Sequence, residues 1–221
     1  MSVVTIERKV LEKNDELAAR NREVFLKHGG FVINIVSSPG SGKTSILERT
    51  LEYLKDKLRV AVIEGDVQTD FDAQRIAKLG VPVVQIVTNG GCHLDAKLVQ
   101  DAIGSLDLNG IQLLIIENVG NLVCPANYDL GEHLKVVVAS TTEGDDKPLK
   151  YPAMFHNASV LLINKTDLLP YVNCKIDDLK KNALHINPKL KVFETSCTTR
   201  QGIPEWCAWL EQQVITINQQ K

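Results

Sequence analysis

The fold of this chain is decided by the stretch Val32-Ile33-Asn34-Ile35-Val36-Ser37-Ser38-Pro39-Gly40-Ser41-Gly42-Lys43-Thr44. An apolar run of strand length leads into a loop of glycine, serine and proline that ends in Gly-Lys-Thr. Leucines then follow at helical spacing, at positions 47, 51, 54 and 58. A strand, a glycine-rich loop and a helix in this order are the context of a phosphate-binding loop, although an ordinary strand-to-helix turn is the alternative. The stretch therefore predicts a nucleotide site.

The predicted loop carries the groups that hold phosphate. Its backbone N–H groups and the partial positive charge of the helix N-terminus would face the anion. Lys43 would reach the β- and γ-phosphates, and the Thr44 hydroxyl would hold Mg²⁺. Ser37 stands where the usual pattern begins with glycine. The residues predicted to bind nucleotide here are Pro39, Gly40, Ser41, Gly42, Lys43, Thr44 and Ser45.

The composition is that of an ordinary globular protein. The 221 residues include 25 Lys plus Arg and 27 Asp plus Glu, so the net charge is -2 and no basic excess points to nucleic acid. No apolar run approaches the roughly 18 residues of a membrane helix, and no signal-peptide pattern occurs at the N-terminus. Five cysteines without a secretion signal indicate a reducing compartment. We therefore expect a cytoplasmic protein without nucleic-acid or membrane partners.

Residues 1–30 form a separate, highly charged segment. Apolar pairs recur seven residues apart between Val10 and Phe25, and Gly29-Gly30 follows as a helix stop signal. This pattern predicts an amphipathic helix over residues 1–30 that packs on the domain or on a partner. We expect a nucleotide-binding domain over residues 31–221.

Beyond the phosphate loop, apolar runs of strand length alternate with helical patterns. The strands expected from these runs cover residues 59–64, 82–87, 111–116, 134–139, 159–163 and 191–194. Alternation of this kind predicts an α/β fold with a mostly parallel sheet and helices on both faces. Polar, glycine-rich loops leave the carboxyl ends of these strands, where ligands bind in such sheets. A charged loop is expected from Glu143 to Lys150, followed by a short helix broken by Pro152.

Two acids at strand ends are candidates for work on the nucleotide. Asp66 follows the second predicted strand, and Glu117 follows the strand at 111–116. Either carboxylate could hold Mg²⁺ or position water, and the Gly120 N–H could meet the γ-phosphate. A helix cap or a solvated loop residue is the alternative for each acid. Together with Lys43, Asp66 and Glu117 are the candidate catalytic residues, and with Thr44 they are the candidate Mg²⁺ ligands.

The tetrapeptide Asn164-Lys165-Thr166-Asp167 follows a predicted strand and indicates the base. A carboxylate accepts hydrogen bonds from both the N1–H and the exocyclic amine of guanine, and adenine lacks that pair of donors. Asp167 would bind the base, Lys165 would stack over it, and Asn164 would brace the loop. A backbone N–H from the Thr195-Ser196-Cys197 segment could meet the guanine oxygen, so Ser196 and Cys197 join the candidate GTP site.

Cys92, His93 and Cys124 form a candidate metal site. Cys92 and His93 are adjacent in a glycine-rich loop, and Cys124 follows the next strand. Thiolate and imidazole suit Zn²⁺ and Ni²⁺, and three ligands leave a fourth position for water or for a second copy of the chain. Isolated cysteines are more often inert core thiols, which is the alternative interpretation.

Five motifs in order resemble the HypB family, the GTPases that help insert nickel into NiFe-hydrogenase during its maturation. They are Ser-Ser-Pro-Gly-Ser-Gly-Lys-Thr (37–44), Glu-Gly-Asp (64–66), Gly-Cys-His-Leu (91–94), Glu-Asn-Val-Gly-Asn-Leu-Val-Cys-Pro (117–125) and Asn-Lys-Thr-Asp-Leu-Leu-Pro-Tyr (164–171). The resemblance covers roughly residues 10 to 217. Its most specific part is the Gly-Cys-His and Val-Cys-Pro pair, which general GTPases lack. Ser37 agrees with this family's form of the loop.

The resemblance implies a P-loop NTPase of the SIMIBI GTPase type that hydrolyses GTP slowly and forms a homodimer when GTP is bound. It implies that Cys92, His93 and Cys124 bind nickel or zinc, and that the partners are the metallochaperone HypA and the hydrogenase large-subunit precursor. From the charged loop at Glu143 to Lys150, and not from the resemblance, we expect Lys147 or Lys150 to reach across a dimer to an acid such as Asp72 or to the nucleotide of the other copy. The alternatives are the urease nickel-insertion GTPase, whose metal motif has a proline between Cys and His, a nucleotide-gated metal carrier without significant catalysis, and a small P-loop kinase.

Overall fold

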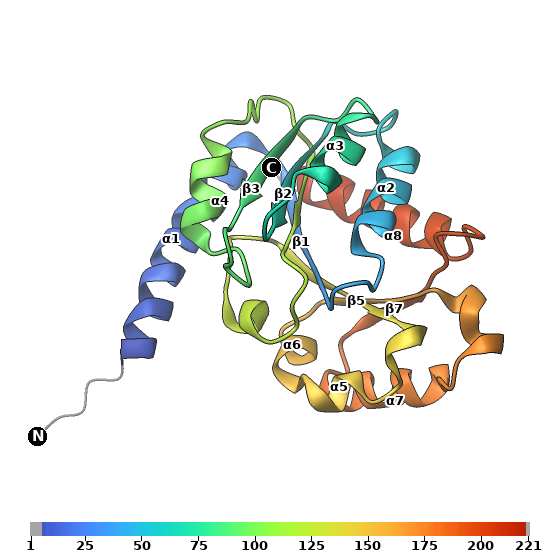
Figure 1. The fold of residues 1–221 in the computed structure, drawn as a ribbon. Coiled ribbons are helices and arrows are strands. Elements are labelled where there is room, and N and C mark those ends of the chain that lie inside the picture. Colours follow the sequence, from blue (N-terminus) through green and yellow to red (C-terminus); the bar gives the residue numbers. More distant parts are fainter. Residues whose placement is uncertain (1–5, 220–221) are drawn as a thin grey trace, which may run out of the picture.

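The computed structural model describes the backbone of residues 6–219 and the side chains of residues 10–217. Within them, seven parallel strands form one sheet in the order β3-β2-β4-β1-β5-β6-β7 (Figure 1). The predicted α/β class with a parallel sheet is confirmed. The strands are β1 (Phe31–Ser37), β2 (Val60–Asp66), β3 (Val83–Val87), β4 (Leu113–Glu117), β5 (Leu134–Ser140), β6 (Val160–Asn164) and β7 (Lys191–Glu194).

Helices cover both faces of this sheet, because the central strands are apolar on both sides. The α-helices are α1 (Ile6–His28), α2 (Lys43–Leu54), α3 (Phe71–Ala77), α4 (Ala96–Ile103), α5 (Lys147–Lys150), α6 (Pro152–His156), α7 (Ile176–Ile186) and α8 (Ile203–Gln219). Three short 3₁₀ helices are η1 (Cys124–Asn127), η2 (Thr141–Glu143) and η3 (Thr166–Tyr171). No helix in the described part of the chain has both the length and the apolar character needed to cross a membrane.

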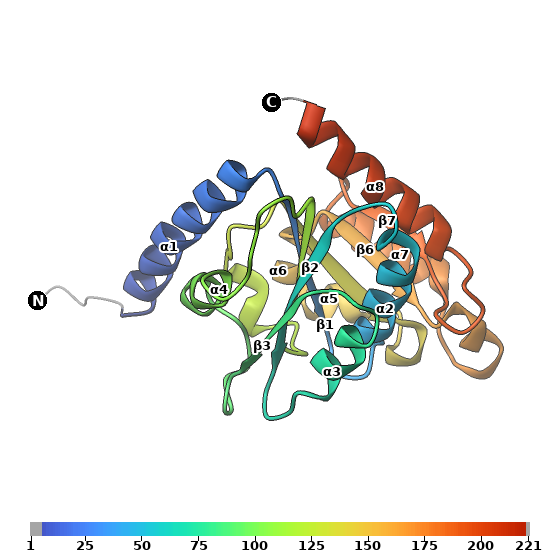
Figure 2. The same cartoon turned by 90° about the horizontal axis from the view of Figure 1, so that it is seen from above.

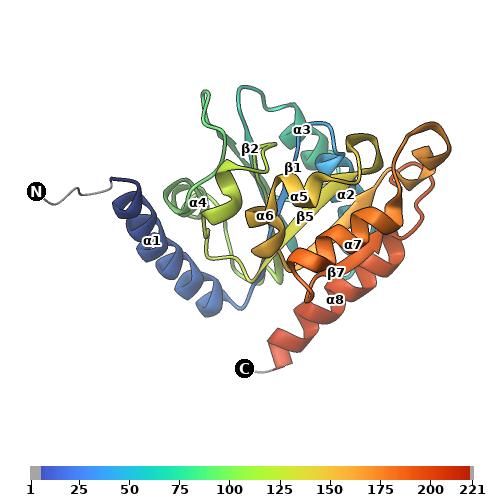
Figure 3. The same cartoon turned by 90° about the horizontal axis from the view of Figure 1, so that it is seen from below.

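The two faces of β1 show how alternate side chains build the hydrophobic core on each side of the sheet, one cluster on one face and two on the other. Ile33 and Ile35 pack in a core with residues of α2, α3 and α8, whereas Val32 and Val36 face the cores formed with α1, α4, α6 and α7. Seen from above and from below, α1 lies beside α4 at one end of the molecule and α8 lies at the other (Figure 2, Figure 3). This arrangement leaves the carboxyl ends of the strands free to carry the site.

The predicted N-terminal helix is α1, which ends before Gly29 in the left-handed conformation at φ 78°. Its buried face consists of Asn14, Ala18, Asn21 and Phe25. The predicted apolar stripe is therefore only partly right, since Val10 is 49% exposed. Residues 1–5 of the predicted segment lie outside the described residues.

The segment from Glu143 to Lys150 differs from the predicted charged loop, because η2 and α5 occupy part of it. Ser140 and Glu143 form a capping box at the start of η2. The Ser140 hydroxyl accepts hydrogen bonds from backbone N–H groups of η2, and the Glu143 carboxylate accepts one from the backbone N–H of Ser140. Pro152 separates α5 from α6 and begins the latter, a position where its missing N–H costs nothing.

Candidate functional site

The loop between β1 and α2 has the tight backbone turns of a phosphate-binding loop. Gly40 and Gly42 have φ values of 77° and 93°, which only glycine adopts without strain. Asn164 Nδ2 donates to Ser41 O at 3.0 Å, and Lys165 Nζ donates to Gly40 O at 2.7 Å. The loop borders a cleft of about 510 Å³, a volume suited to a nucleotide.

A buried ion pair lies at the floor of this cleft. The Lys43 ammonium donates to the carboxylate of Glu117, the last residue of β4, which is 0% exposed. Burial alone would lower the pKa of Lys43, but the Glu117 carboxylate raises it above its ordinary value. Burial alone would raise the pKa of Glu117, but Lys43 holds that pKa below its usual range. Both groups are therefore charged, and a phosphate would compete with Glu117 for Lys43.

Two acids contact the Thr44 hydroxyl, and a third lies beside them. Thr44 Oγ1 donates to Glu117 Oε1 at 2.6 Å and contacts Asp72 Oδ2 at 3.0 Å. Carboxylate oxygens of Glu64, Asp72 and Glu117 lie within 4.8 Å of one another. One buried oxygen of Glu64 and one of Glu117 have no hydrogen-bond partner. Hard oxygen ligands with unsatisfied lone pairs fit Mg²⁺.

Glu64, one of these three acids, has a strongly raised pKa. Burial first, and then the nearby Glu117 charge, raise the pKa of Glu64 to about 11. A carboxyl group with this pKa binds a proton on folding, so the free energy of unfolding decreases as pH rises from the unfolded pKa of 4.5 toward 11. Without a cation, Glu64 is therefore a neutral acid at physiological pH.

A Glu64→Gln substitution is expected to raise the free energy of unfolding of the nucleotide-free protein above about pH 7 and to flatten its decline with pH. Glutamine needs no proton to enter the buried site, and each kcal/mol gained should raise Tm by about 2–4 °C at this chain length. Urea denaturation at a series of pH values measures the effect, with Glu205→Gln at an exposed position of α8 as the matched control. An unchanged slope would show that Glu64 is ionised in the folded protein.

Asp66 and Gly120, the other predicted members, line the same cleft. Asp66 Oδ1 accepts from the backbone N–H groups of Gln68 and Thr69 at 2.9 and 2.6 Å. Partial burial would raise the pKa of Asp66, but these hydrogen bonds outweigh that effect and lower the pKa below its ordinary value. A Cβ on Gly120 would lie 3.2 Å from the backbone of Pro39, so glycine permits this loop to approach the phosphate loop. Asp66 thus braces its own loop, while the direct contacts with Thr44 come from Glu117 and Asp72.

The predicted base-binding residues converge beside the loop. Asp167 Oδ1 accepts from Ser196 Oγ at 2.6 Å, and Cys197 Sγ lies 3.6 Å from Asn164 Oδ1. The Ser196 backbone N–H already donates to Gln201 O at 2.9 Å. Ser196 therefore orients Asp167 through its side chain. Because the Ser196 backbone N–H is already used, the Cys197 backbone N–H is the remaining candidate donor to the guanine oxygen.

Cys92, His93 and Cys124 come together at the carboxyl ends of β3 and β4. Their ligand atoms lie within 4.8 Å of one another, and Cys92 Sγ is 3.5 Å from His93 Nδ1. Cys92 is exposed and the other two are half-buried, so the cluster is open to a metal ion and to a further ligand. Burial lowers the pKa of His93, which favours the neutral imidazole that binds metals. The Cys124 thiol raises the pKa of Cys92 through a shared hydrogen bond.

Sequence reasoning did not place Glu64 in the site, and it expected Lys147 to reach across a dimer and not to contact its own phosphate loop. An acid inside an apolar strand indicates a functional group, so the sequence could have pointed to Glu64. Its neighbour Glu117, however, follows only from the order of the strands in the sheet. Lys147 Nζ donates to Ser38 Oγ at 3.3 Å and pairs with Glu143 at 3.4 Å. Lys147 thus contacts the phosphate loop of its own chain, whereas Lys150 pairs with Asp146.

Comparison with known proteins gives consistent matches. The family described as CobW/HypB/UreG, nucleotide-binding domain, matches residues 31–194. The hydrogenase maturation factor HypB of Azotobacter vinelandii is 54% identical over 96% of this chain and 70% of its own length. A crystal structure of HypB from Helicobacter pylori in complex with nickel has a TM-score of 0.88 at 39% identity, covering 92% of this chain and 96% of that one.

A more distant match concerns the fold alone. The signal recognition particle receptor FtsY of Elizabethkingia anophelis has a TM-score of 0.52 at 16% identity, covering 82% of this chain and 65% of that one. This likeness agrees with the predicted α/β fold of strands alternating with helices.

Proposed function

The chain belongs to the HypB family of hydrogenase maturation factors, and on this premise we propose that it is a GTPase whose nucleotide state gates a Cys/His nickel site. Nickel is the cargo destined for the hydrogenase precursor, and zinc is a competing occupant because the same ligands suit both metals. The observation that carries the proposal is the convergence of Cys92, His93 and Cys124, because the loop that leads to Cys124 also lines the nucleotide cleft at Val119 and Gly120. The nickel-bound structure of the Helicobacter pylori relative supports the choice of metal.

The proposed division of labour within the nucleotide site follows from its contacts. Lys43 and the loop N–H groups bind the phosphates, and Asp167, braced by Ser196, binds guanine. Thr44, Glu117 and either Asp72 or Asp66 would hold Mg²⁺, which supplies charge neutralisation for phosphoryl transfer when bound. Residues 31–221 form the nucleotide domain in this proposal, and α1 is an accessory helix.

We infer that phosphate binding releases Glu117 from Lys43. The γ-phosphate would take the Lys43 ammonium, because a charge-assisted bond to phosphate replaces the one to carboxylate. Glu117, which already accepts a hydrogen bond from Thr44, would then be free to hold Mg²⁺ or the attacking water. The loop from Val119 to Gly120 would follow the movement of Glu117. This loop leads directly to Cys124, so the exchange offers a physical route from nucleotide to metal.

The proposed partners are a second copy of the chain in the GTP state, the metallochaperone HypA and the hydrogenase large-subunit precursor. We also propose a cytoplasmic location, which the five free thiols support. A carrier without significant catalysis is the remaining candidate of another class. GTP turnover that stays negligible with HypA present would favour the carrier.

Nickel affinity is expected to differ by about fivefold or more between the GDP-bound and GTP-analogue-bound protein, a typical coupling between sites. The physical reason is the shared loop between Glu117 and Cys124. Nickel titration with each nucleotide and Mg²⁺ measures the ratio, and an ATP analogue is the control that should leave affinity unchanged. Equal nickel affinities and identical nickel absorption spectra with GDP and with the GTP analogue would contradict the proposed gating.

A further inference from the structure

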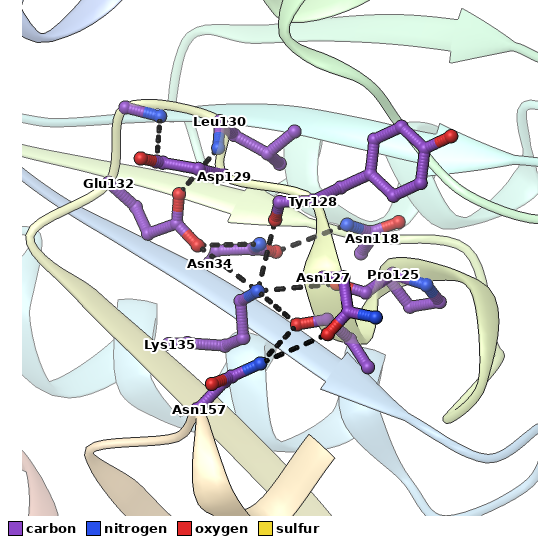
Figure 4. Close-up of polar contacts among 12 residues, drawn as sticks. Asn34, Asn118, Pro125, Asn127, Tyr128, Asp129, Leu130, Glu132, Lys135 and Asn157 are labelled. Atoms are coloured by element: carbon purple, nitrogen blue, oxygen red, sulfur yellow. Dashed lines mark hydrogen bonds and ion pairs between the residues drawn. The ribbon is translucent and has the colours of Figure 1, made fainter. Parts of the chain in front are cut away.

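A network of buried polar side chains links Asn118, Asn34, Glu132 and Lys135 (Figure 4). Asn34 is its middle member and is 0% exposed, in a strand that is otherwise apolar up to Ser37. Burying an amide in such a strand is costly unless both of its ends are hydrogen-bonded. Asn34 Nδ2 donates to Glu132 Oε1 at 3.1 Å, and Asn34 Oδ1 accepts from Asn118 Nδ2 at 3.3 Å.

At one end of this network of side chains, Asn118 holds the segment that carries His93. Asn118 follows Glu117 and is 0% exposed. Its Oδ1 accepts from the backbone N–H of Leu94 at 3.0 Å and from that of Val119 at 2.9 Å. A single amide oxygen therefore joins the residue after His93 to the loop that leaves the nucleotide site.

The other end holds the segment that carries Cys124. Lys135 Nζ donates to the carbonyl oxygens of Pro125 and Ala126, each at 3.2 Å, and of Tyr128 at 3.0 Å. These three carbonyls belong to η1 and the residue after it, and η1 begins with Cys124. The three ammonium donors are thus all used on one short turn.

Glu132 closes the chain between the two ends. Its Oε1 lies 3.8 Å from Lys135 Nζ, and its Oε2 accepts from the Leu130 N–H at 2.7 Å. Tyr128, held by Lys135, packs its ring against that of His93 with centroids 4.1 Å apart. Both metal-bearing segments are therefore fixed by one buried network. Its members are Asn34 in β1, Asn118 just after β4, Glu132 just before β5 and Lys135 in β5.

We propose that Lys135 and Asn118 are positioning residues for Cys124 and His93, and that the chain through Asn34 and Glu132 makes nickel affinity depend on the strand that ends at Glu117. This inference rests on the proposed function, since it assigns the residues through which the gating acts. Outer groups that orient metal ligands commonly change metal affinity by about 10–100-fold when removed. A coupling route is established only by a measured change in coupling, so the test must report it.

The test compares nickel binding by wild-type protein and by Lys135→Met, each with GDP and with a nonhydrolysable GTP analogue. Methionine keeps the shape of the lysine side chain up to Cε but lacks the terminal ammonium, so it donates nothing to the η1 carbonyls. We expect affinity to fall about tenfold, the thiolate-to-nickel absorption to shift, and the affinity ratio between nucleotides to approach one. Lys181→Met, at an exposed position of α7, is the matched control.

Asn34→Ala provides a second variant, which breaks the chain at its middle without touching either metal-bearing segment. It is expected to lower the nucleotide-dependent ratio while the nickel spectrum with GDP stays close to that of the wild type. Wild-type spectra and ratios in both variants, even with a lowered Tm, would show a merely structural network and overturn the proposal. A wild-type ratio of one would instead reject the gating, and the spectrum and affinity of Lys135→Met would still decide the positioning role.

Discussion

Replacing Asp167 by asparagine is expected to lower affinity for GTP by about 10³-fold or more and to create affinity for xanthosine triphosphate. In the proposed site the carboxylate would accept two hydrogen bonds from guanine, whereas asparagine can accept only one and presents a donor to the other position. Xanthine has a carbonyl oxygen where guanine has its amine, so it matches the new donor. Equilibrium titration with guanosine and xanthosine nucleotides measures the exchange.

The surroundings of Asp167 make this substitution a clean test. Ser196 Oγ donates to Asp167 Oδ1 at 2.6 Å, and an asparagine oxygen can accept the same bond, so the local fold should persist. Asp178→Asn, at an exposed position of α7, is the matched control and should leave both affinities unchanged. Loss of GTP binding without any gain for the xanthosine nucleotide would mean that Asp167 serves only to hold Ser196.

The predicted site residues that the structure brings together as expected are those that are contiguous in the sequence. The phosphate loop needs Gly40, Gly42 and Lys43 at fixed spacing, and the base-binding residues follow one strand in a row. Their roles depend on local backbone geometry, which short motifs specify. The parallel α/β fold follows for a similar reason, because apolar strands alternate with helices along the whole chain.

The parts that the sequence leaves open depend on strand order and register. Glu64 lies opposite Glu117 only because β2 pairs with β4 in that register, and nothing in either strand alone specifies the partner. The chain from Asn118 to Lys135 has the same origin, since its members meet across β4, β1 and β5. Asn14 and Asn21 interrupt the apolar stripe of α1 for a related reason, because they donate to Asp129, Ala96 and Leu130 on other segments.

Replacing Cys124 by serine is expected to lower nickel affinity by about a hundredfold or more, beyond the effect of losing an outer group. Serine keeps the shape of the side chain but substitutes a hard hydroxyl for the soft thiolate that late transition metals prefer. The thiolate-to-nickel absorption should also weaken, because only Cys92 would remain as a sulfur donor. Nickel titration followed by absorption measures both changes.

The matched control for that substitution is Cys174→Ser, because Cys174 is also half-buried but lies outside the cluster. Nickel affinity in Cys124→Ser equal to that of the wild type would place the metal elsewhere. GTP affinity supplies the second criterion. If it is kept while nickel is lost, the two sites are built from separate groups. Any dependence of one ligand on the other must then arise from the loop and the buried network between Glu117 and Cys124, and not from a shared ligand.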